Sequence, residues 1–521
     1  MVGRILFFIL VPSLYLFSQP QRIGKWGIFE SSYENFGHFR NPYTDVDLWV
    51  EFVGPDDRKV KVPGFYDGNY TWKIRFMPGI TGKWKYSGIF SDGTNAGTGA
   101  FTCTSSGLPG MIEAFKPNPV WFGTSEGIPL ILKSFQAGDR YFAANWDNPE
   151  SNADGNPRND FLGWIQQKGY NMLCLGSFFT NRKTEGRGLS WNTPSPWPLD
   201  FTEFRKTEIL LNELAQRKIF VFPFAGFFGR DGEWPTDTIE QEQYIKYTIA
   251  RWGAYYNLVW NVAGPEPLLD GESSPKTGYK NQMEIPDIRR IAGLIRKYDA
   301  FHHMISVHNQ TSASKSGDPF KNEDWYDFST IQGPKTLTLK IHSQSAALNH
   351  HPAKPYLAQE TLWFGNKYHP EYNEDNIRGI AISLILSGAS INFADNSGNS
   401  SSGFSGSLDL NDRHESEHNA FLNAVHLFKK LPWSSMKPDT SLFQGLAALR
   451  NDGEEKYIVY YEKPGKYEVM VQPGSYRASW IIPVSGIRMQ SKLVEVVREI
   501  KTPPENHDWL LFLEKMGETN Q

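Results

Sequence analysis

Two glutamates, Glu266 and Glu360, each follow a short apolar run in the sequence. The runs are residues 258–262 and 355–359, and both have the length and composition of a strand buried on two faces. Each carboxyl group should therefore lie where a strand ends. Two carboxylates at the mouth of one barrel can hydrolyse a glycosidic bond, because one protonates the leaving oxygen and the other attacks or stabilises the anomeric carbon.

Other polar and aromatic residues at predicted strand ends and in the loops beyond them are candidate substrate contacts. These are Trp146, Asp147, His308, Asn309, Gln332, Trp363 and Asp395. Tryptophan rings can stack on the C–H faces of sugars, and Trp234 is a further candidate of this kind, although core packing is the alternative for each ring. For His308 the alternative is a core histidine with its hydrogen bonds satisfied.

Eight apolar runs alternate with amphipathic stretches between about residue 118 and residue 435, and they predict the element that positions these side chains. The runs are 128–134, 171–177, 219–224, 258–262, 304–308, 328–331, 355–359 and 389–394. Residues 243–252 and 288–297 have helical spacing. Eight βα units predict a (β/α)8 barrel, whose catalytic groups lie at the carboxyl ends of the strands. An open doubly wound sheet is the alternative, but no glycine-rich phosphate loop follows the first run.

The segments on either side of the barrel have a different pattern. Short alternating strands at 46–53, 70–76 and 82–88, separated by glycine and proline turns, predict a β-sandwich. Strand-like runs return from about residue 440. We therefore predict a multidomain protein, with the following division: signal peptide 1–20, N-terminal β-sandwich 21–106, catalytic (β/α)8 TIM barrel 110–436 and a small C-terminal β-sandwich 437–521.

Bulk properties limit the partners of the chain. The 521 residues carry a net charge of −4 without a basic stripe, which argues against nucleic acid. Arg4 precedes an apolar run over 5–17, as in a secretory signal peptide, and this run is shorter than the ~20 residues of a membrane span. We expect export to the periplasm or the extracellular space without stable membrane insertion; an uncleaved anchor is the alternative. The sequence leaves the oligomeric state open.

No metal and no cofactor are expected. The loop that begins at Glu150 imitates the start of a calcium loop, but its twelfth position is Phe161, where a bidentate glutamate is needed. Cys103 and Cys174 fall in different predicted domains. We interpret both as small buried side chains and not as a disulfide or a metal pair.

Several segments resemble known domains. The barrel resembles the apiosidase-like branch of clan A glycoside hydrolases. The front is similar to the β-sandwich of unknown function that often precedes such barrels, and the tail resembles a β domain labelled as collagen-binding. The matching segments are 255–262 with 266–267, 354–360, 386–392 and 431–439 in the barrel, 25–30, 41–46, 62–67 and 99–103 in the front, and 480–486 and 507–511 in the tail.

The resemblance implies a retaining glycosidase with Glu266 as acid/base and Glu360 as nucleophile, whose carboxyl groups would lie ~5–5.5 Å apart. The chain departs from the family pattern at one position. Clan A enzymes usually have asparagine directly before the acid/base, where it holds the sugar 2-hydroxyl, whereas Pro265 stands here. We therefore expect a bulged end of the fourth strand, with Asn261 or His308 in place of that asparagine.

Further alternatives stay open. Asp270 and Glu272 are fallback acids. The substrate class that the resemblance implies is a plant or algal cell-wall polysaccharide or its oligosaccharides, with sugar, linkage and endo or exo action unspecified. A non-catalytic carbohydrate-binding or adhesion protein on a degenerate barrel is the competing hypothesis, and matrix-protein binding by the tail is a third.

Overall fold

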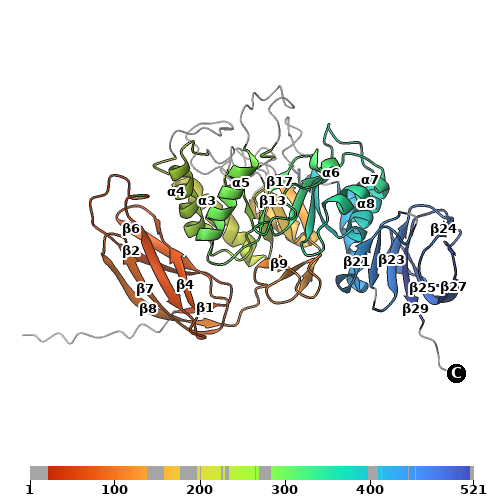
Figure 1. The fold of residues 1–521 in the computed structure, drawn as a ribbon, viewed down its shortest axis with the longest axis horizontal. Helices are drawn as coiled ribbons and strands as arrows, with labels where there is room; N and C mark the ends of the chain where they lie inside the picture. The colour runs from red at the N-terminus through yellow and green to blue at the C-terminus, as the bar shows by residue number, and fades with distance from the viewer. Residues whose placement is uncertain are drawn as a thin grey trace, which may run out of the picture.

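The computed structural model has a central α/β part between two β-rich ends (Figure 1). It describes residues 21–137, 158–175, 196–199, 201–224, 227–228, 234–264, 266–268, 283–396, 409–411, 414–443, 445–451 and 453–516. Trp146, Asp147, Asp270, Glu272 and the predicted signal peptide lie outside these ranges. Within these ranges, no helix has the length and apolar character needed to cross a membrane.

The N-terminal β domain consists of two antiparallel-rich sheets around one core. The first has the order β1-β8-β7-β3-β4, with β1 (Arg22–Gly24), β3 (Leu48–Val53), β4 (Lys59–Pro63), β7 (Gly82–Phe90) and β8 (Asn95–Thr104). The second has the order β2-β6-β5, with β2 (Phe29–Glu34), β5 (Phe65–Tyr66) and β6 (Thr71–Phe76). Alternate residues of β3 and β6, such as Phe52 and Phe76, stack in the core that both sheets share. A small sheet follows, in the order β11-β10-β9: β9 (Ile112–Ala114), β10 (Phe122–Thr124) and β11 (Pro129–Leu130).

The central domain is barrel-like and built on parallel strands. Seven strands have the order β14-β13-β12-β20-β19-β18-β17: β12 (Lys133–Ala137), β13 (Met172–Leu175), β14 (Phe220–Phe222), β17 (His308–Asn309), β18 (Ser329–Gln332), β19 (Tyr356–Phe364) and β20 (Ala389–Asp395). A two-stranded parallel sheet joins β15 (Trp260–Asn261) and β16 (Ile305–Ser306). It lies between the two ends of the larger sheet, because Val221 of β14 bridges to Leu258, and only Val307 separates β16 from β17.

Helices alternate with these strands. They are α2 (Arg158–Lys168), α3 (Phe201–Gln216), α4 (Thr238–Trp252), α5 (Ile285–Tyr298), α6 (Ala313–Ser316), α7 (Leu339–Asn349), α8 (Glu374–Leu386) and α9 (Glu415–Leu427), followed by the 3-10 turns η3 (Phe428–Lys430) and η4 (Trp433–Ser435). The helical spacing predicted for 243–252 and 288–297 is confirmed in α4 and α5. In α5 the apolar stripe, including Ile288, Ile291 and Ile295, is buried.

The predicted first barrel strand is displaced. The sequence indicates 128–134, whereas β12 covers Lys133–Ala137 and the earlier apolar pair Pro129–Leu130 forms β11 in the small antiparallel sheet. The reason is that the inward-facing residues of β12 are polar. Ser134 and Gln136 take part in buried hydrogen bonds, so β12 has no continuous apolar run to mark it.

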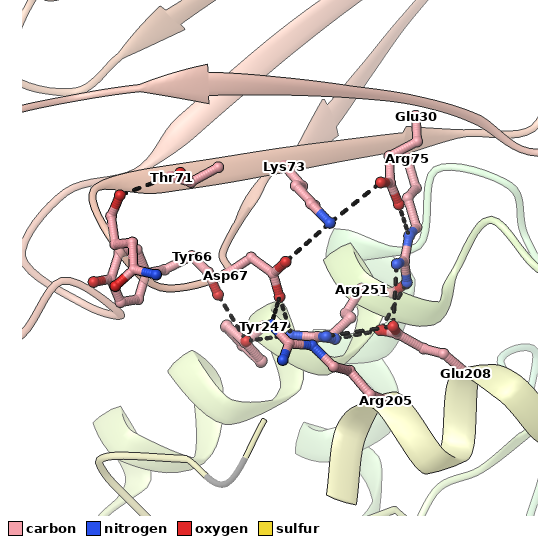
Figure 2. A network of polar contacts seen from close by, with 11 residues as sticks. Glu30, Tyr66, Asp67, Thr71, Lys73, Arg75, Arg205, Glu208, Tyr247 and Arg251 are labelled. Atoms are coloured by element: carbon pink, nitrogen blue, oxygen red, sulfur yellow. Dashed lines mark hydrogen bonds and ion pairs between the residues drawn. The ribbon is translucent and has the colours of Figure 1, made fainter. Parts of the chain in front are cut away.

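A buried ionic network joins the N-terminal β domain to the barrel helices (Figure 2). Arg75 of β6 donates to Glu208 of α3 over 2.8 Å. Arg251 of α4, whose side chain is 1% exposed, contacts Glu208 and lies 3.1 Å from Asp67. Burial alone would raise the pKa of Glu208, but Arg75 and Arg251 outweigh it and hold this pKa below its ordinary value. The network therefore fixes the β domain on the barrel while every buried charge keeps an opposite partner.

Replacing Arg251 with methionine should lower the free energy of unfolding by about 3–5 kcal/mol, because Glu208 and Asp67 lose a partner in a buried site. Urea unfolding of the full chain measures the change. Arg205→Met is the matched control, since the Arg205 side chain is 58% exposed and 3.9 Å from Asp67; about 1 kcal/mol or less is expected there. Equal effects of the two variants would contradict the account.

The C-terminal sheet is packed on both faces. It has the order β21-β22-β23-β29-β25-β26, with β27 beside β25: β21 (Lys437–Asp439), β22 (Ala448–Asn451), β23 (Lys456–Tyr461), β25 (Gly474–Ile482), β26 (Ile487–Arg488), β27 (Lys492–Val496) and β29 (Trp509–Lys515). Ile458 and Leu510 extend the barrel core from one face. Val459 and Leu511 pack on the other face, in the core that includes residues near the pair β24 (Lys466–Glu468) and β28 (Glu499–Lys501). An isolated tail would expose the first face, so its binding properties need to be tested in the whole chain.

Candidate active site

Glu360 lies at an irregular point of β19. In the pairing of β19 with β20, Ala358 is opposite Ile391 and Leu362 is opposite Phe393. Four residues of one strand thus span two of its neighbour, and Glu360 takes a φ of 47° within this bulge. Bulges beside active sites redirect a side chain, and here Glu360 points into the barrel next to the inward-facing Gln359.

Glu266 lies in the loop after β15, beside the start of β17. The Val262 amide donates to the Ser306 carbonyl over 2.9 Å, and the Glu266 amide donates to the His308 carbonyl over 3.0 Å. Glu266 has a φ of 53°. Pro265, on which the expectation of a bulged strand end rests, lies outside the described residues. The Glu266 side chain is partly exposed.

Glu266 and Glu360 thus share a positive φ angle. A positive φ is unfavourable for a residue other than glycine and costs of the order of 1–3 kcal/mol, so it persists where the surroundings enforce it. Gly333 beside the β19 bulge shows how tight these surroundings are, because a Cβ atom there would lie 1.8 Å from the Thr361 hydroxyl oxygen. Such strain concentrates at functional sites.

Glu360 is held by two amide donors. Its side chain is nearly buried, with 5% of the residue exposed. Gln136 of β12 donates to Oε1 over 3.1 Å, and Gln332 of β18 donates to Oε2. Each carboxylate oxygen accepts one N–H, so the carboxyl group is held in one orientation. The arrangement suits a nucleophile that has to stay oriented.

Gln136 contacts Glu360 and is a residue of this candidate site that the sequence did not reveal. Its Oε1 accepts hydrogen bonds from Gln359 (3.2 Å) and Asn392 (3.0 Å), which orients its amide group towards Glu360. Cys174 belongs to the same network, since its thiol contacts Gln359 over 3.1 Å. Both Cys174 and Cys103 are buried free thiols. The alternation of Ser134 and Gln136 along β12 was the available signal, but the predicted strand ended before it reached Gln136.

His308 lies beside Glu360 inside the barrel. The distance from its Nε2 to Glu360 Oε2 is 3.8 Å, and its residue is 1% exposed. Burial lowers the pKa of His308, although the charge of Glu360 opposes this shift, so the neutral form of the imidazole is favoured. The structure thus brings together Glu360, Gln332 and His308, with the main chain of Glu266 bound to His308.

Asn261 is close to this group, but its side-chain amide forms hydrogen bonds with main-chain atoms. Its Oδ1 accepts the His308 amide over 3.1 Å, and its Nδ2 donates to the Phe224 carbonyl. Asn261 therefore supports the backbone at the end of the fourth strand. It positions His308 and does not have its amide directed at a ligand.

Asn309 and Asp395 do not belong to the inward-facing group. Side chains of a strand alternate between its two faces, so Asn309 points away from the barrel interior when its neighbour His308 points in. Its Nδ2 donates to Asp318 over 3.1 Å. Asp395 likewise faces α9, where His418 Nε2 lies 2.8 Å and His414 Nδ1 3.1 Å from its carboxylate. Neither residue is placed to contact a ligand inside the barrel.

Asp395→Asn should therefore affect stability more than catalysis. Burial alone would raise the pKa of Asp395, but hydrogen bonds from His414 and His418 lower it overall. A depressed folded-state pKa stabilises the protein above the unfolded value of about 4, and this contribution is lost as the pH falls below it. We expect a loss of about 3 kcal/mol at pH 7 that shrinks at acid pH, with kcat/KM of the folded protein retained. Urea unfolding against pH measures it; Asp375→Asn, with a side chain 79% exposed, is the control.

The tryptophan candidates divide between two positions. Trp363 pairs with Ala394 on the inward side of β19 and β20, and it is 1% exposed. Trp234 is 2% exposed and packs against Phe228 and Tyr244. Trp146 and Asp147 lie outside the described residues. Core packing accounts for Trp234, whereas Trp363 lies at the level of the mouth beyond Glu360.

Among the residues that the structure describes, no group of three or more histidine, cysteine, aspartate or glutamate side chains is arranged to hold a metal ion.

Two family models match the chain. Residues 159–392 match the apiosidase-like catalytic domain, and residues 22–91 match a domain of unknown function, DUF5060. The first match contains Glu266 and Glu360, and the second covers most of the N-terminal β domain. A search of curated proteins finds no significant match.

Solved structures share the fold. A protein from Bacteroides vulgatus, provisionally named a glycoside hydrolase, has a TM-score of 0.70 at 18% identity, over 95% of this chain and 100% of its own. A glycoside hydrolase family 5 structure from the same organism has a TM-score of 0.53 at 15% identity, over 78% of this chain and 95% of its own. The first covers both β-rich ends together with the barrel-like domain.

Proposed function

We infer that this chain, a glycoside hydrolase with an apiosidase-like catalytic domain, cleaves its substrate with retention of configuration, using Glu360 as nucleophile and Glu266 as acid/base. The observation that carries the proposal is the positive φ angle that the two glutamates share. Both glutamates take a positive φ, 47° for Glu360 in the irregular part of β19 and 53° for Glu266 in the loop after β15. A strained backbone at the two glutamates predicted at strand ends four and seven is the pattern expected for a catalytic pair.

The reaction has two displacements. In the first, a carboxylate oxygen of Glu360 bonds to the anomeric carbon while the bond to the leaving oxygen breaks, and Glu266 gives its proton to that oxygen. In the second, water attacks the anomeric carbon, Glu266 takes the water proton, and the ester bond to Glu360 breaks. Repulsion from the charge of Glu360 favours the protonated form of Glu266 in the first step. The mechanism needs a carboxyl separation of ~5–5.5 Å in the substrate complex.

The surrounding architecture supports the same proposal. We propose that the parallel strands close into a (β/α)8 barrel flanked by β-sandwiches, and that the chain is exported after removal of residues 1–20. The substrate class is a cell-wall polysaccharide or its oligosaccharides. A barrel mouth that places Glu360, Gln332 and His308 together fits a sugar ring, which needs both a nucleophile and hydrogen-bond partners for its hydroxyl groups.

Incubation of the purified chain with a panel of plant and algal polysaccharides, followed by product analysis, tests the function. New reducing ends from one class of polysaccharide are expected, and they should vanish in the Glu360→Gln variant. Tight glycan binding by the wild type without any release of reducing ends would instead indicate a carbohydrate-binding protein on a degenerate barrel.

A further inference from the structure

The His308 imidazole is buried without a hydrogen bond to any residue that the structure describes. Its residue is 1% exposed, and neither Nδ1 nor Nε2 has a hydrogen-bond partner among the residues that the structure describes. A buried polar group without a partner costs about 1–3 kcal/mol, so such a group in a folded protein calls for an explanation. Core packing does not supply one, because a core position of this size is better filled by an apolar side chain.

The main chain of His308 is held by two hydrogen bonds, and its ring packs beside Phe224. The His308 amide donates to Asn261 Oδ1 over 3.1 Å, and the His308 carbonyl accepts the Glu266 amide over 3.0 Å. The ring centroid lies 5.0 Å from that of Phe224. His308 is therefore bound through its main chain to the acid/base residue, while its imidazole faces the nucleophile. A fixed donor loses little conformational entropy when it binds a ligand.

The gap between His308 and Glu360 has the size for a shared ligand group. Nε2 and Oε2 are 3.8 Å apart, which is too long for a hydrogen bond between them. A hydroxyl oxygen beside this gap can accept an N–H from the imidazole and donate to the carboxylate. Glu360 attacks the anomeric carbon, so the sugar hydroxyl nearest to this gap is the one on the adjacent ring carbon, the 2-hydroxyl.

We propose that His308 hydrogen-bonds the 2-hydroxyl of the sugar that Glu360 attacks, in the place of an asparagine before the acid/base, where this chain has Pro265. The proposal rests on the proposed function and chooses between the two candidates that the sequence left open. Asn261 is excluded because both ends of its amide are bound to the main chain. A neutral imidazole has one N–H donor and one acceptor nitrogen, which is what a hydroxyl group requires.

The hydrogen bond from His308 should stabilise the transition state more than it stabilises the bound substrate. Hydrogen bonds to the 2-hydroxyl strengthen as the oxocarbenium-like transition state forms, and they supply several kcal/mol in glycosidases. Loss of the His308 donor should therefore lower kcat more than it raises KM. A packing role alone would change thermal stability and leave the response to the substrate 2-hydroxyl untouched.

A cycle between protein and substrate tests the proposal. The probes are the 4-nitrophenyl glycoside that the wild type hydrolyses and its 2-deoxy analogue, each assayed with wild type, His308→Ala and His308→Gln. The fall in kcat/KM from wild type to His308→Ala should be about 100-fold on the parent glycoside and about threefold or less on the 2-deoxy analogue. Comparison of enzymes on one substrate cancels the intrinsic reactivity of each glycoside. His308→Gln, which keeps an N–H donor, should recover part of the loss on the parent only.

Equal losses on both glycosides would overturn the proposal. If His308→Ala does not fold, the same comparison with His308→Gln and His308→Asn decides it, because a misplaced amide should still penalise the parent more than the 2-deoxy analogue. Failure of the His308 proposal can be told apart from failure of the proposed function. If the proposed function were wrong, the wild type would hydrolyse no glycoside, or the Glu360→Gln variant would remain active.

Discussion

Replacing Glu360 with glutamine should lower kcat by about 10⁴-fold or more on every substrate that the wild type cleaves. The amide has the volume of the carboxyl group, so the barrel should keep its fold, but it cannot form the covalent intermediate. Steady-state kinetics with product analysis measures the loss. A melting temperature within a few degrees of wild type shows that the variant is folded.

The matched control for this variant is Glu371→Gln. Glu371 is exposed in the segment after β19, so the same chemical change should leave kcat within about twofold of wild type. Retained turnover in folded Glu360→Gln would refute the nucleophile assignment. Azide added to a Glu360→Gly variant offers a second readout, because azide can enter the vacated space and give a glycosyl azide of inverted configuration.

Replacing Glu266 with alanine should have an effect that depends on the leaving group. Hydrolysis of unactivated oligosaccharides should fall by about 10²–10⁴-fold, because their leaving oxygen needs a proton. The dinitrophenolate of a dinitrophenyl glycoside leaves without being protonated. The first step of its hydrolysis should therefore be nearly unchanged, and the glycosyl-enzyme should accumulate. A burst in stopped-flow absorbance measures this accumulation.

Azide and pH dependence complete this experiment. Azide needs no general base, so it should restore turnover of Glu266→Ala and give a glycosyl azide of retained configuration. The basic limb of the pH profile should also disappear. A uniform loss across leaving groups, without azide rescue, would assign the acid/base role to another residue.

Much of the barrel-like fold could be predicted because its strands are buried on two faces. The runs around Leu173 and Val221 are continuous and apolar, as expected for parallel strands covered by helices. The strand β12 was displaced because Ser134 and Gln136 interrupt this pattern. These residues bind other polar groups inside the barrel, and a partner far along the chain leaves no local signal in the sequence.

The site was predictable in its residue types and less so in its geometry. Strand ends indicated His308 and Asn309 equally, and only the observed phase of the strand shows that one faces Glu360 and the other faces Asp318. The positive φ of Glu360 depends on how β19 pairs with β20, which no local sequence feature encodes. The ionic contact between Arg75 and Glu208 likewise joins residues 133 positions apart.

Trapping of the glycosyl-enzyme tests the central claim most directly. A 2-deoxy-2-fluoro glycoside with a dinitrophenyl leaving group should inactivate the wild type. The fluorine slows both steps, but the reactive leaving group keeps the first step fast, so the glycosyl-enzyme accumulates. Intact mass should rise by one fluoroglycosyl group, and peptide fragmentation should place it on Glu360. An active enzyme that forms no adduct, or an adduct on a different carboxyl group, would contradict the account.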